Sequence, residues 1–168
     1  YARKHGLPRV HSSRVWSRAV RAKLRDKGIN LGVVANFDQR LPEALLAIPE
    51  NGFINLHPSL LPAYRGPNPL EYILLNQEPT SGVTWHAVAP EIDAGDILAQ
   101  EAFDVELDYG VKDLMRISLR LANQLLPPLL ADISAGRAKA IPQDERQAST
   151  YPKAGPAEMN KLAAMGKF

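Results

Sequence analysis

The stretch Phe53-Ile54-Asn55-Leu56-His57 predicts a β-strand, and Pro58 ends it. Side chains at positions i and i+2 of a strand point to the same face, so Asn55 and His57 are expected to project together. In open α/β folds, ligands bind in the crevice at the carboxyl ends of the strands. Because His57 stands at that end, we expect this strand to carry a functional site.

Other strands and helices are expected on both sides of this strand. Apolar runs predict strands over residues 31–37, 82–89 and 97–105, and helices are expected over residues 14–27, 43–47, 70–76 and 111–135. The alternation predicts an α/β fold: a Rossmann-like, mixed but mostly parallel sheet flanked by helices. The tight connection over residues 91–95 favours an antiparallel hairpin between the last two strands. In the last helix, Pro127 and Pro128 are expected to kink or break the chain.

The composition is that of an ordinary globular domain. The 168 residues are 45% hydrophobic and 23% charged, enough for one buried core. The chain has no cysteine, which excludes disulfides, thiolate metal sites and a cysteine nucleophile. No apolar run approaches the length that spans a bilayer, so we expect a cytoplasmic protein with no membrane association. A catalytic domain, itself partial, is expected over residues 1–141, followed by an extended tail or linker over residues 142–168.

Positive charge is concentrated near the N-terminus. Residues 1–28 hold nine Lys/Arg and one acidic residue, whereas residues 29–168 hold eleven Lys/Arg and seventeen acidic residues. The expected helix over residues 14–27 has Ser12 or Ser13 as its N-cap and Gly28 at its end. Four arginines share one face of it: Arg14, Arg18, Arg21 and Arg25. Such a face can bind a polyanion such as charged tRNA, although most charged helix faces are simply solvated.

Three polar residues are candidates for chemistry: Asn55, His57 and Asp93. An asparagine amide can donate a hydrogen bond to a developing oxyanion, and a histidine can stabilise the same charge or carry a proton. Asp93 lies in a turn in which Gly95 is expected to supply positive φ, and its carboxylate can orient His57 or accept a proton. Together these groups suit acyl transfer to an external nucleophile. The alternative, from residue types alone, is a structural Asn-x-His pair and an ordinary Asp-x-Gly turn.

The sequence around these residues resembles the folate-dependent formyltransferase family. The string Asn55-Leu56-His57-Pro58-Ser59-Leu60-Leu61-Pro62-Ala63-Tyr64-Arg65-Gly66 is similar to that family's signature. Gly82-Val83-Thr84 and Ile92-Asp93-Ala94-Gly95-Asp96-Ile97-Leu98 match its second block in order and spacing. A weaker third match runs from Gln143 through Ala148-Ser149-Thr150-Tyr151-Pro152-Lys153. The resemblance implies formyl transfer from 10-formyltetrahydrofolate to a primary amine, without a metal, and that most of an N-terminal βαβ unit is missing.

The resemblance also implies roles for single residues. Asn55 and His57 would stabilise the oxyanion of a tetrahedral intermediate, while Asp93 would hold His57 in its working state and assist proton removal from the amine. The pterin of the folate donor would bind two segments, formed by Asp38, Gln39, Arg40 and Leu41 and by Ala89, Pro90, Glu91 and Ile92. Arg40 departs from the family, in which an apolar residue is usual at this place.

Smaller features bear on the acceptor amine. Tyr64-Arg65-Gly66 resembles the branch that contains methionyl-tRNA formyltransferases and sugar-nucleotide N-formyltransferases, and methionyl-tRNA is the expected acceptor. Thr84-Trp85-His86 is similar to enzymes that act on sugars and carrier-bound amines, although His86 is also explained as a strand histidine with a satisfied hydrogen bond. Two other functions stay open: hydrolysis of the donor to release formate, and folate binding without activity.

Overall fold

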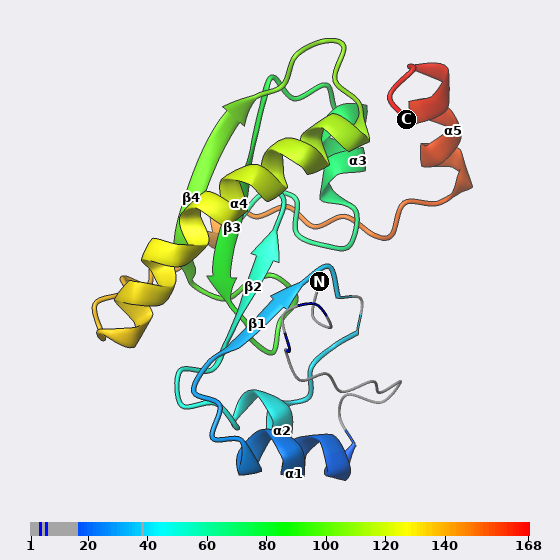
Figure 1. Ribbon diagram of the computed structural model, residues 1–168. Helices are drawn as coiled ribbons and strands as arrows, with labels where there is room; N and C mark the ends of the chain where they lie inside the picture. The colour runs from blue at the N-terminus through cyan, green and yellow to red at the C-terminus, as the bar shows by residue number, and fades with distance from the viewer. Residues whose placement is uncertain (1–3, 5, 7–16, 38) are drawn as a thin grey trace.

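Four strands form one mixed sheet in the computed structural model, which describes residues 4, 6, 17–37 and 39–168. They are β1 (Gly32–Ala35), β2 (Phe53–His57), β3 (Thr80–Ala87) and β4 (Ile97–Asp104), side by side in that order (Figure 1). β1 and β2 are parallel, whereas the β2–β3 and β3–β4 pairs are antiparallel. The predicted α/β fold, mixed sheet and hairpin between the last two strands are therefore confirmed.

Parallel pairing is less frequent in the described part of the sheet than we expected, since one of its three pairs is parallel. After β2 the chain forms an irregular loop over residues 58–68 and then the short helix α3 (Pro69–Leu75). A parallel pair needs a crossover connection that returns along one face of the sheet. This loop and helix do not provide one, so the chain re-enters the sheet in the opposite direction as β3.

The first helix of the described chain, α1 (Arg18–Asp26), begins later than expected. Its N-cap is Ser17, whose hydroxyl accepts a hydrogen bond from the Val20 N–H at 3.3 Å, whereas Ser12 and Ser13, the expected N-cap residues, lie outside the described residues. Gly28 takes the positive φ expected just beyond the helix end. Arg14 and the rest of residues 7–16 lie outside the described residues. The next helix is α2 (Glu43–Leu46), for which Pro42 is the N-cap.

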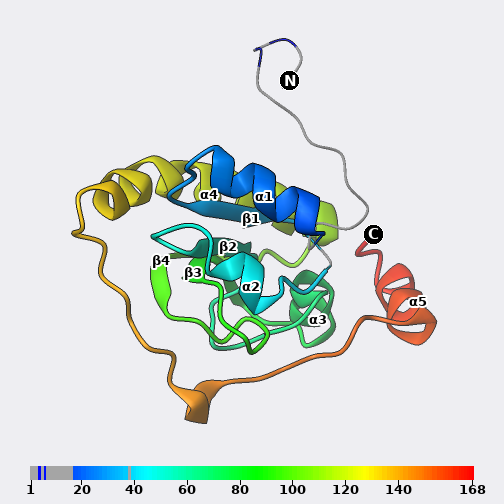
Figure 2. The ribbon, with the colours of Figure 1, turned by 90° about the horizontal axis from the view of Figure 1, so that it is seen from below.

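The long helix α4 (Val111–Ser134) covers one face of the sheet, as Figure 2 shows. Ala122 and Leu129 pack with sheet residues in one buried cluster. Pro127 and Pro128 lie inside the helix without ending it, so the expected break does not occur. A proline inside a helix costs about 3 kcal/mol or more, and apolar contacts on both sides of the prolines hold α4 against the sheet.

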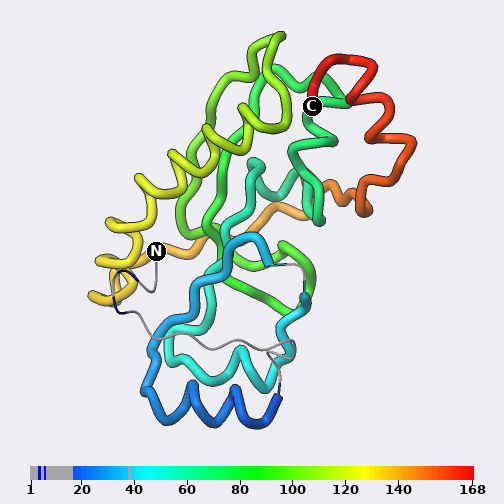
Figure 3. The backbone as a smooth tube through the Cα atoms, turned by 45° about the vertical axis from the view of Figure 1, so that its right-hand side comes forward, coloured from blue at the N-terminus to red at the C-terminus, as the bar shows by residue number. Residues whose placement is uncertain are grey.

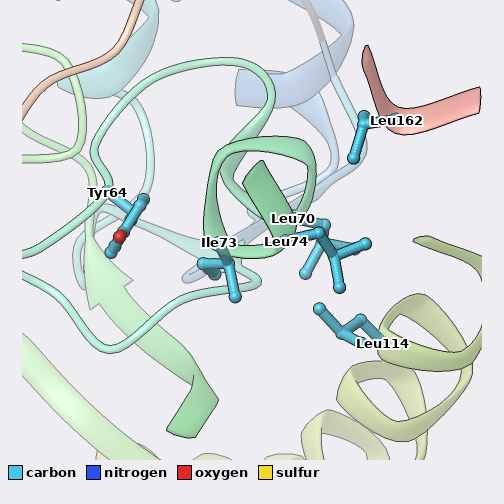
Figure 4. Close-up of a cluster of buried hydrophobic side chains, with 6 residues drawn as sticks. All are labelled: Tyr64, Leu70, Ile73, Leu74, Leu114 and Leu162. Carbon is cyan, nitrogen blue, oxygen red and sulfur yellow. The ribbon is translucent and has the colours of Figure 1, made fainter. Parts of the chain in front are cut away.

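A second buried cluster joins α3, α4 and the last helix, α5 (Pro156–Ala164). Figure 4 shows its six buried members, which are Tyr64, Leu70, Ile73, Leu74, Leu114 and Leu162. Leu162 is fully buried there. Residues 156–164 are therefore a packed helix rather than part of an extended tail, because Leu162 fills an apolar site beside α3.

Between α4 and α5 the chain runs largely extended past the loop that follows β2 (Figure 3). The short 3-10 helix η1 (Glu145–Gln147) is its one helical interruption in the described chain. Across the residues that the structure describes, no helix combines the length and apolarity needed to cross a bilayer.

Candidate active site

The candidate site lies on the sheet face opposite α4. Side chains alternate along β3, so Trp85 packs toward α4 while His86 points to the other face. The β2–β3 register places Asn55 opposite His86 and His57 opposite Thr84. Strand pairing therefore gathers four polar side chains on one face, because directly opposed residues share a face.

Asp93 reaches this face from the turn between β3 and β4. Its Oδ2 lies 3.6 Å from His57 Nδ1, and its Oδ1 lies 3.6 Å from His86 Nε2. Oδ2 also accepts a hydrogen bond from the Gly66 N–H at 2.9 Å. The carboxylate thus lies between the two imidazole rings, whose centroids are 6.3 Å apart. The structure brings together Asn55, His57 and Asp93, the three residues selected from the sequence.

His57 is buried and held in one tautomer. Its Nε2 is 2.8 Å from the Tyr64 carbonyl oxygen, which can only accept, so Nε2 carries the proton. Burial lowers the pKa of His57, against smaller raising effects of Asp93 and of the hydrogen bond to Tyr64. The ring is therefore neutral at pH 7, and Nδ1 presents a lone pair toward Asp93.

Asn55 and His86 form a second pair beside His57. His86 Nδ1 donates to the Ala87 carbonyl oxygen at 2.8 Å, so its Nε2 accepts a hydrogen bond from Asn55 Nδ2 at 3.1 Å. Burial lowers the pKa of His86, and this effect exceeds the opposing influences of Ala87 and Asp93. An asparagine amide has two N–H groups. Asn55 therefore keeps one donor for another acceptor at this site.

The turn that carries Asp93 differs from expectation in which residue takes the unusual backbone conformation. Asp93 itself has a φ of 52°, whereas Gly95 is absent from the positive-φ residues of the described chain. Gly95 is required for another reason: a Cβ there would lie 1.9 Å from the Ala87 carbonyl oxygen. Left-handed backbone at a residue other than glycine is uncommon and concentrates at functional sites.

Three contributors to the site were missed or left undecided by sequence reasoning: His86, the Tyr64 carbonyl and Gln143. The Gln143 amide donates to the carbonyl oxygens of Asp93 and Gly95, at 2.8 and 2.7 Å. His86 could have been found from the strand register, since it lies directly opposite Asn55. The Tyr64 carbonyl depends on the path of the irregular loop after β2, and Gln143 on a contact with a distant turn, and the sequence offers no periodic signal for either.

The two segments expected to hold a pterin also meet. The Arg40 guanidinium donates a hydrogen bond to the Pro90 carbonyl oxygen, which links the first segment to the second. This contact gives a physical reason for an arginine at a place where the related family usually has an apolar residue. Ile92 is 63% exposed on the second segment. Asp38, which was expected in the first segment, lies outside the described residues.

The groups gathered here are hydrogen-bond donors and proton acceptors. Within the described chain, no group of three or more His, Cys, Asp or Glu side chains has a spacing suited to a metal ion. Asn55 offers an N–H, His57 an unprotonated Nδ1, and Asp93 a carboxylate beside it. Such a set can stabilise a developing oxyanion and take a proton from an attacking nucleophile.

Known proteins resemble this chain over most of its length. A family model described as "Formyl transferase" matches residues 3–130. Methionyl-tRNA formyltransferase from Staphylococcus aureus is 34% identical over 148 residues, a match that covers 88% of this chain and 48% of that protein. The chain therefore spans about half the length of the curated relatives it matches.

Solved structures with related sequences share the fold. Glycinamide ribonucleotide transformylase 1 from Symbiobacterium toebii matches with a TM-score of 0.75 at 28% identity, over 85% of this chain and 73% of that one. The N-formyltransferase from Helicobacter canadensis, in complex with folinic acid and dTDP-3-aminofucose, matches with a TM-score of 0.58 at 28% identity, over 60% of this chain and 37% of that one. By its sequence and its fold, this chain belongs to the formyl transferase family.

Proposed function

We propose that this protein transfers a formyl group from 10-formyltetrahydrofolate to a primary amine, with Asn55, His57 and Asp93 as its catalytic residues. The observation that carries the proposal is the meeting of these three side chains on one face of the sheet, where His57 is buried beside a second buried histidine. Membership of the formyl transferase family supports the reaction class. Acyl transfer to an amine requires a hydrogen-bond donor for the oxyanion, a proton acceptor and a charge that stabilises the protonated acceptor. Asn55, His57 and Asp93 supply these three groups.

The reaction begins when the amine lone pair attacks the formyl carbon and the carbonyl electrons move onto oxygen. The free N–H of Asn55 donates to this oxyanion. The amine, now cationic, loses its proton to His57 Nδ1, and Asp93 stabilises the resulting imidazolium beside the oxyanion. When the carbonyl re-forms, the bond to N10 of the folate breaks and N10 takes the proton from His57. The products are a formamide and tetrahydrofolate.

The folate donor is assigned to the two segments joined by Arg40 and Pro90. The Helicobacter canadensis structure contains folinic acid, which is itself a formylated folate. Here the pocket would be formed by Asp38, Gln39, Arg40 and Leu41 on one side and by Ala89, Pro90, Glu91 and Ile92 on the other. The second segment leads directly into the turn of Asp93, so a folate whose pterin is held there would place its N10 formyl group near the catalytic residues.

Methionyl-tRNA is the acceptor that we propose first. Relatives of this chain are methionyl-tRNA formyltransferases. In the described chain, α1 has no buried residue, and Arg18, Arg21 and Arg25 are spaced three and four apart, so they share one face. Basic side chains in such an arrangement bind nucleic-acid phosphates. Arg14 was expected on the same face, and its position is not among those described.

A sugar nucleotide carrying a primary amine is the second acceptor. The Helicobacter canadensis structure contains dTDP-3-aminofucose. In this chain His86 lies in the site, hydrogen-bonded to Asn55 and 3.6 Å from Asp93. The sequence around His86 is similar to enzymes that act on sugars, and its place beside the catalytic residues favours a part in acceptor binding.

The experiment that tests the reaction follows tetrahydrofolate release from 10-formyltetrahydrofolate. The purified protein is assayed alone, with charged methionyl-tRNA and with an aminated sugar nucleotide. Release that requires methionyl-tRNA supports the first acceptor, and release that requires the sugar nucleotide supports the second. Release without any amine indicates a hydrolase. Measurable folate binding without release indicates an inactive binding module and contradicts the proposal.

The tRNA assignment has its own test in α1. Replacing Arg18→Glu together with Arg21→Glu is expected to weaken tRNA binding and to reduce the slope of log K against log salt by about two, one for each lost phosphate contact. Arg116→Glu with Arg137→Glu makes the same charge change elsewhere on the protein and serves as the control. If both double variants bind tRNA like the parent protein, α1 has only a solvated face.

A further inference from the structure

The segment over residues 141–154, here called the strap, lies on the same side of the sheet as the catalytic residues. Figure 2 shows it leaving the end of α4 and passing the sheet on the side opposite that helix, before it reaches α5. At its start, Ile141 pairs with Ile97, the first residue of β4. The strap contains the third string that resembles the formyltransferase family, from Gln143 to Lys153. None of the proposed catalytic residues lies in the strap, so their roles do not explain this resemblance.

Gln143 connects the strap to the catalytic turn. Its amide nitrogen donates to the backbone carbonyls of Asp93 and Gly95, at 2.8 and 2.7 Å. Its side-chain oxygen accepts two hydrogen bonds from the Arg65 guanidinium, at 3.1 and 2.7 Å. Every hydrogen-bonding group of the Gln143 side chain is therefore engaged. The side chain forms a bridge from the loop after β2 to the backbone of Asp93.

Arg65 holds the other end of this bridge firmly. It is 7% exposed, and its guanidinium also makes a bidentate pair with Glu145 of the strap, at 3.0 and 2.7 Å. A planar guanidinium bound on two edges has little freedom to rotate. The oxygen of Gln143 is thus held in place, and its two N–H groups are directed at the turn.

The strap also fastens the loop that contacts His57. Ser149 accepts a hydrogen bond from the Tyr64 N–H through its hydroxyl and another from the Arg65 N–H through its carbonyl. The Tyr151 N–H donates to the Arg65 carbonyl oxygen, and a Cβ on Gly66 would lie 2.2 Å from the Tyr151 carbonyl oxygen. This loop supplies the Tyr64 carbonyl that accepts from His57 and the Gly66 N–H that binds Asp93.

We propose that Gln143 is a positioning residue for formyl transfer, and that it keeps the Asp93 carboxylate between the two histidines by bracing the turn from the strap. This inference rests on the proposed function of Asn55, His57 and Asp93. The side-chain hydrogen bonds of Gln143 go to Arg65, Asp93 and Gly95 and not to a histidine, so it acts through the backbone of residues 93–95. The left-handed conformation of Asp93 calls for such support, because residues other than glycine adopt it only at an energetic cost.

The test compares two glutamines of the same segment. Gln143→Ala removes the bridge, and we expect kcat to fall by about 10- to 100-fold with little change in KM for 10-formyltetrahydrofolate. Gln147→Ala is the matched control, because Gln147 is exposed and its side chain donates to Asp144 Oδ2 at 3.1 Å, away from the catalytic turn. Gln143→Glu keeps an oxygen for Arg65 but loses both N–H donors, and is expected to lower kcat as much as the alanine variant does.

A second readout does not depend on turnover. The pKa of His57, followed by NMR of its ring carbon-bound protons, reports how near the Asp93 carboxylate lies. When the turn relaxes in Gln143→Ala, the carboxylate raises this pKa less, so we expect a lower value than in the parent protein and in Gln147→Ala. Wild-type kcat, or an unchanged His57 pKa, in Gln143→Ala overturns the positioning role. If the parent protein formylates no amine, the proposed function fails instead, while the NMR comparison still tests Gln143.

Discussion

The sheet has two faces that side-chain alternation in β2 and β3 keeps apart, one toward α4 and one toward the loop after β2. Toward α4 the side chains are mostly apolar: Ile54, Val83 and Trp85 are between 0 and 3% exposed, and Ser81, 2% exposed, is a polar exception on β3. Toward the loop, Thr84, His57 and His86 are polar and between 0 and 4% exposed. These side chains are thus buried to the same degree on both faces, and burial alone does not distinguish the core from the candidate site.

The faces differ in what compensates their burial. Apolar burial is favourable without any particular geometry, and on the α4 side the indole of Trp85 needs one partner, the Ala122 carbonyl oxygen at 3.1 Å. On the other side each buried polar group needs its own partner. The Thr84 hydroxyl, for example, donates to the Ser59 carbonyl oxygen at 2.6 Å and accepts from the Leu61 N–H at 3.2 Å. The α4 face should therefore govern stability, and the polar face catalysis.

Trp85→Ala is expected to have the largest effect in free energy, on the α4 face. Removing the indole leaves a cavity beside Ile54 and Val83 and should lower the free energy of unfolding by about 3–5 kcal/mol. Denaturant unfolding measures this loss, and Trp85→Phe, which leaves a smaller cavity, should lose less. Turnover per folded molecule should stay near that of the parent. A large loss of turnover with unchanged stability would show that the two faces are not separate.

Asp93→Asn is the corresponding change on the polar face. The substitution keeps the shape of the side chain but removes the charge that stabilises a protonated His57, so turnover should fall by at least ~100-fold. His57→Ala should have an effect of the same size. Folate binding, measured by isothermal titration calorimetry, should survive in both variants, and the unfolding midpoint of Asp93→Asn should change little. Normal turnover in either variant contradicts the catalytic assignment.

The strands that form the two faces were predicted from the sequence more readily than the polar contacts of the candidate site. Phe53–His57 was predicted to the residue, because a run that favours strand structure is ended by Pro58. Asn55, His57 and Asp93 were selected because each lies in a short, continuous motif. In contrast, the Gln143 bridge depends on how segments pack across a separation of 50 residues, and the Tyr64 carbonyl, although only seven residues from His57, depends on the path of an irregular loop.

Local rules also gave way where tertiary contacts outweighed them. α4 continues through Pro127 and Pro128 because contacts with the sheet lie on both sides of them, and α5 forms where a polar, proline-bearing composition suggested an extended tail. Leu162, fully buried against α3, decides the second case. Propensity is a weak guide when a single side chain can bury itself in an existing cluster.

The smallest effect that we predict is a dependence of stability on pH that arises from the polar face alone. Burial lowers the pKa of His57 and of His86 below 6.5, so the unfolded chain binds these protons more readily than the folded protein does. The free energy of unfolding should therefore decrease as the pH falls from 7.5 toward 5, a range in which carboxylates mostly stay ionised. Denaturant midpoints across this range measure the slope. His57→Gln with His86→Gln should flatten it, whereas Trp85→Phe should lower the whole curve and leave the slope unchanged. An equal slope in the double variant would mean that protons bind elsewhere, and that the two faces do not differ in their response to pH.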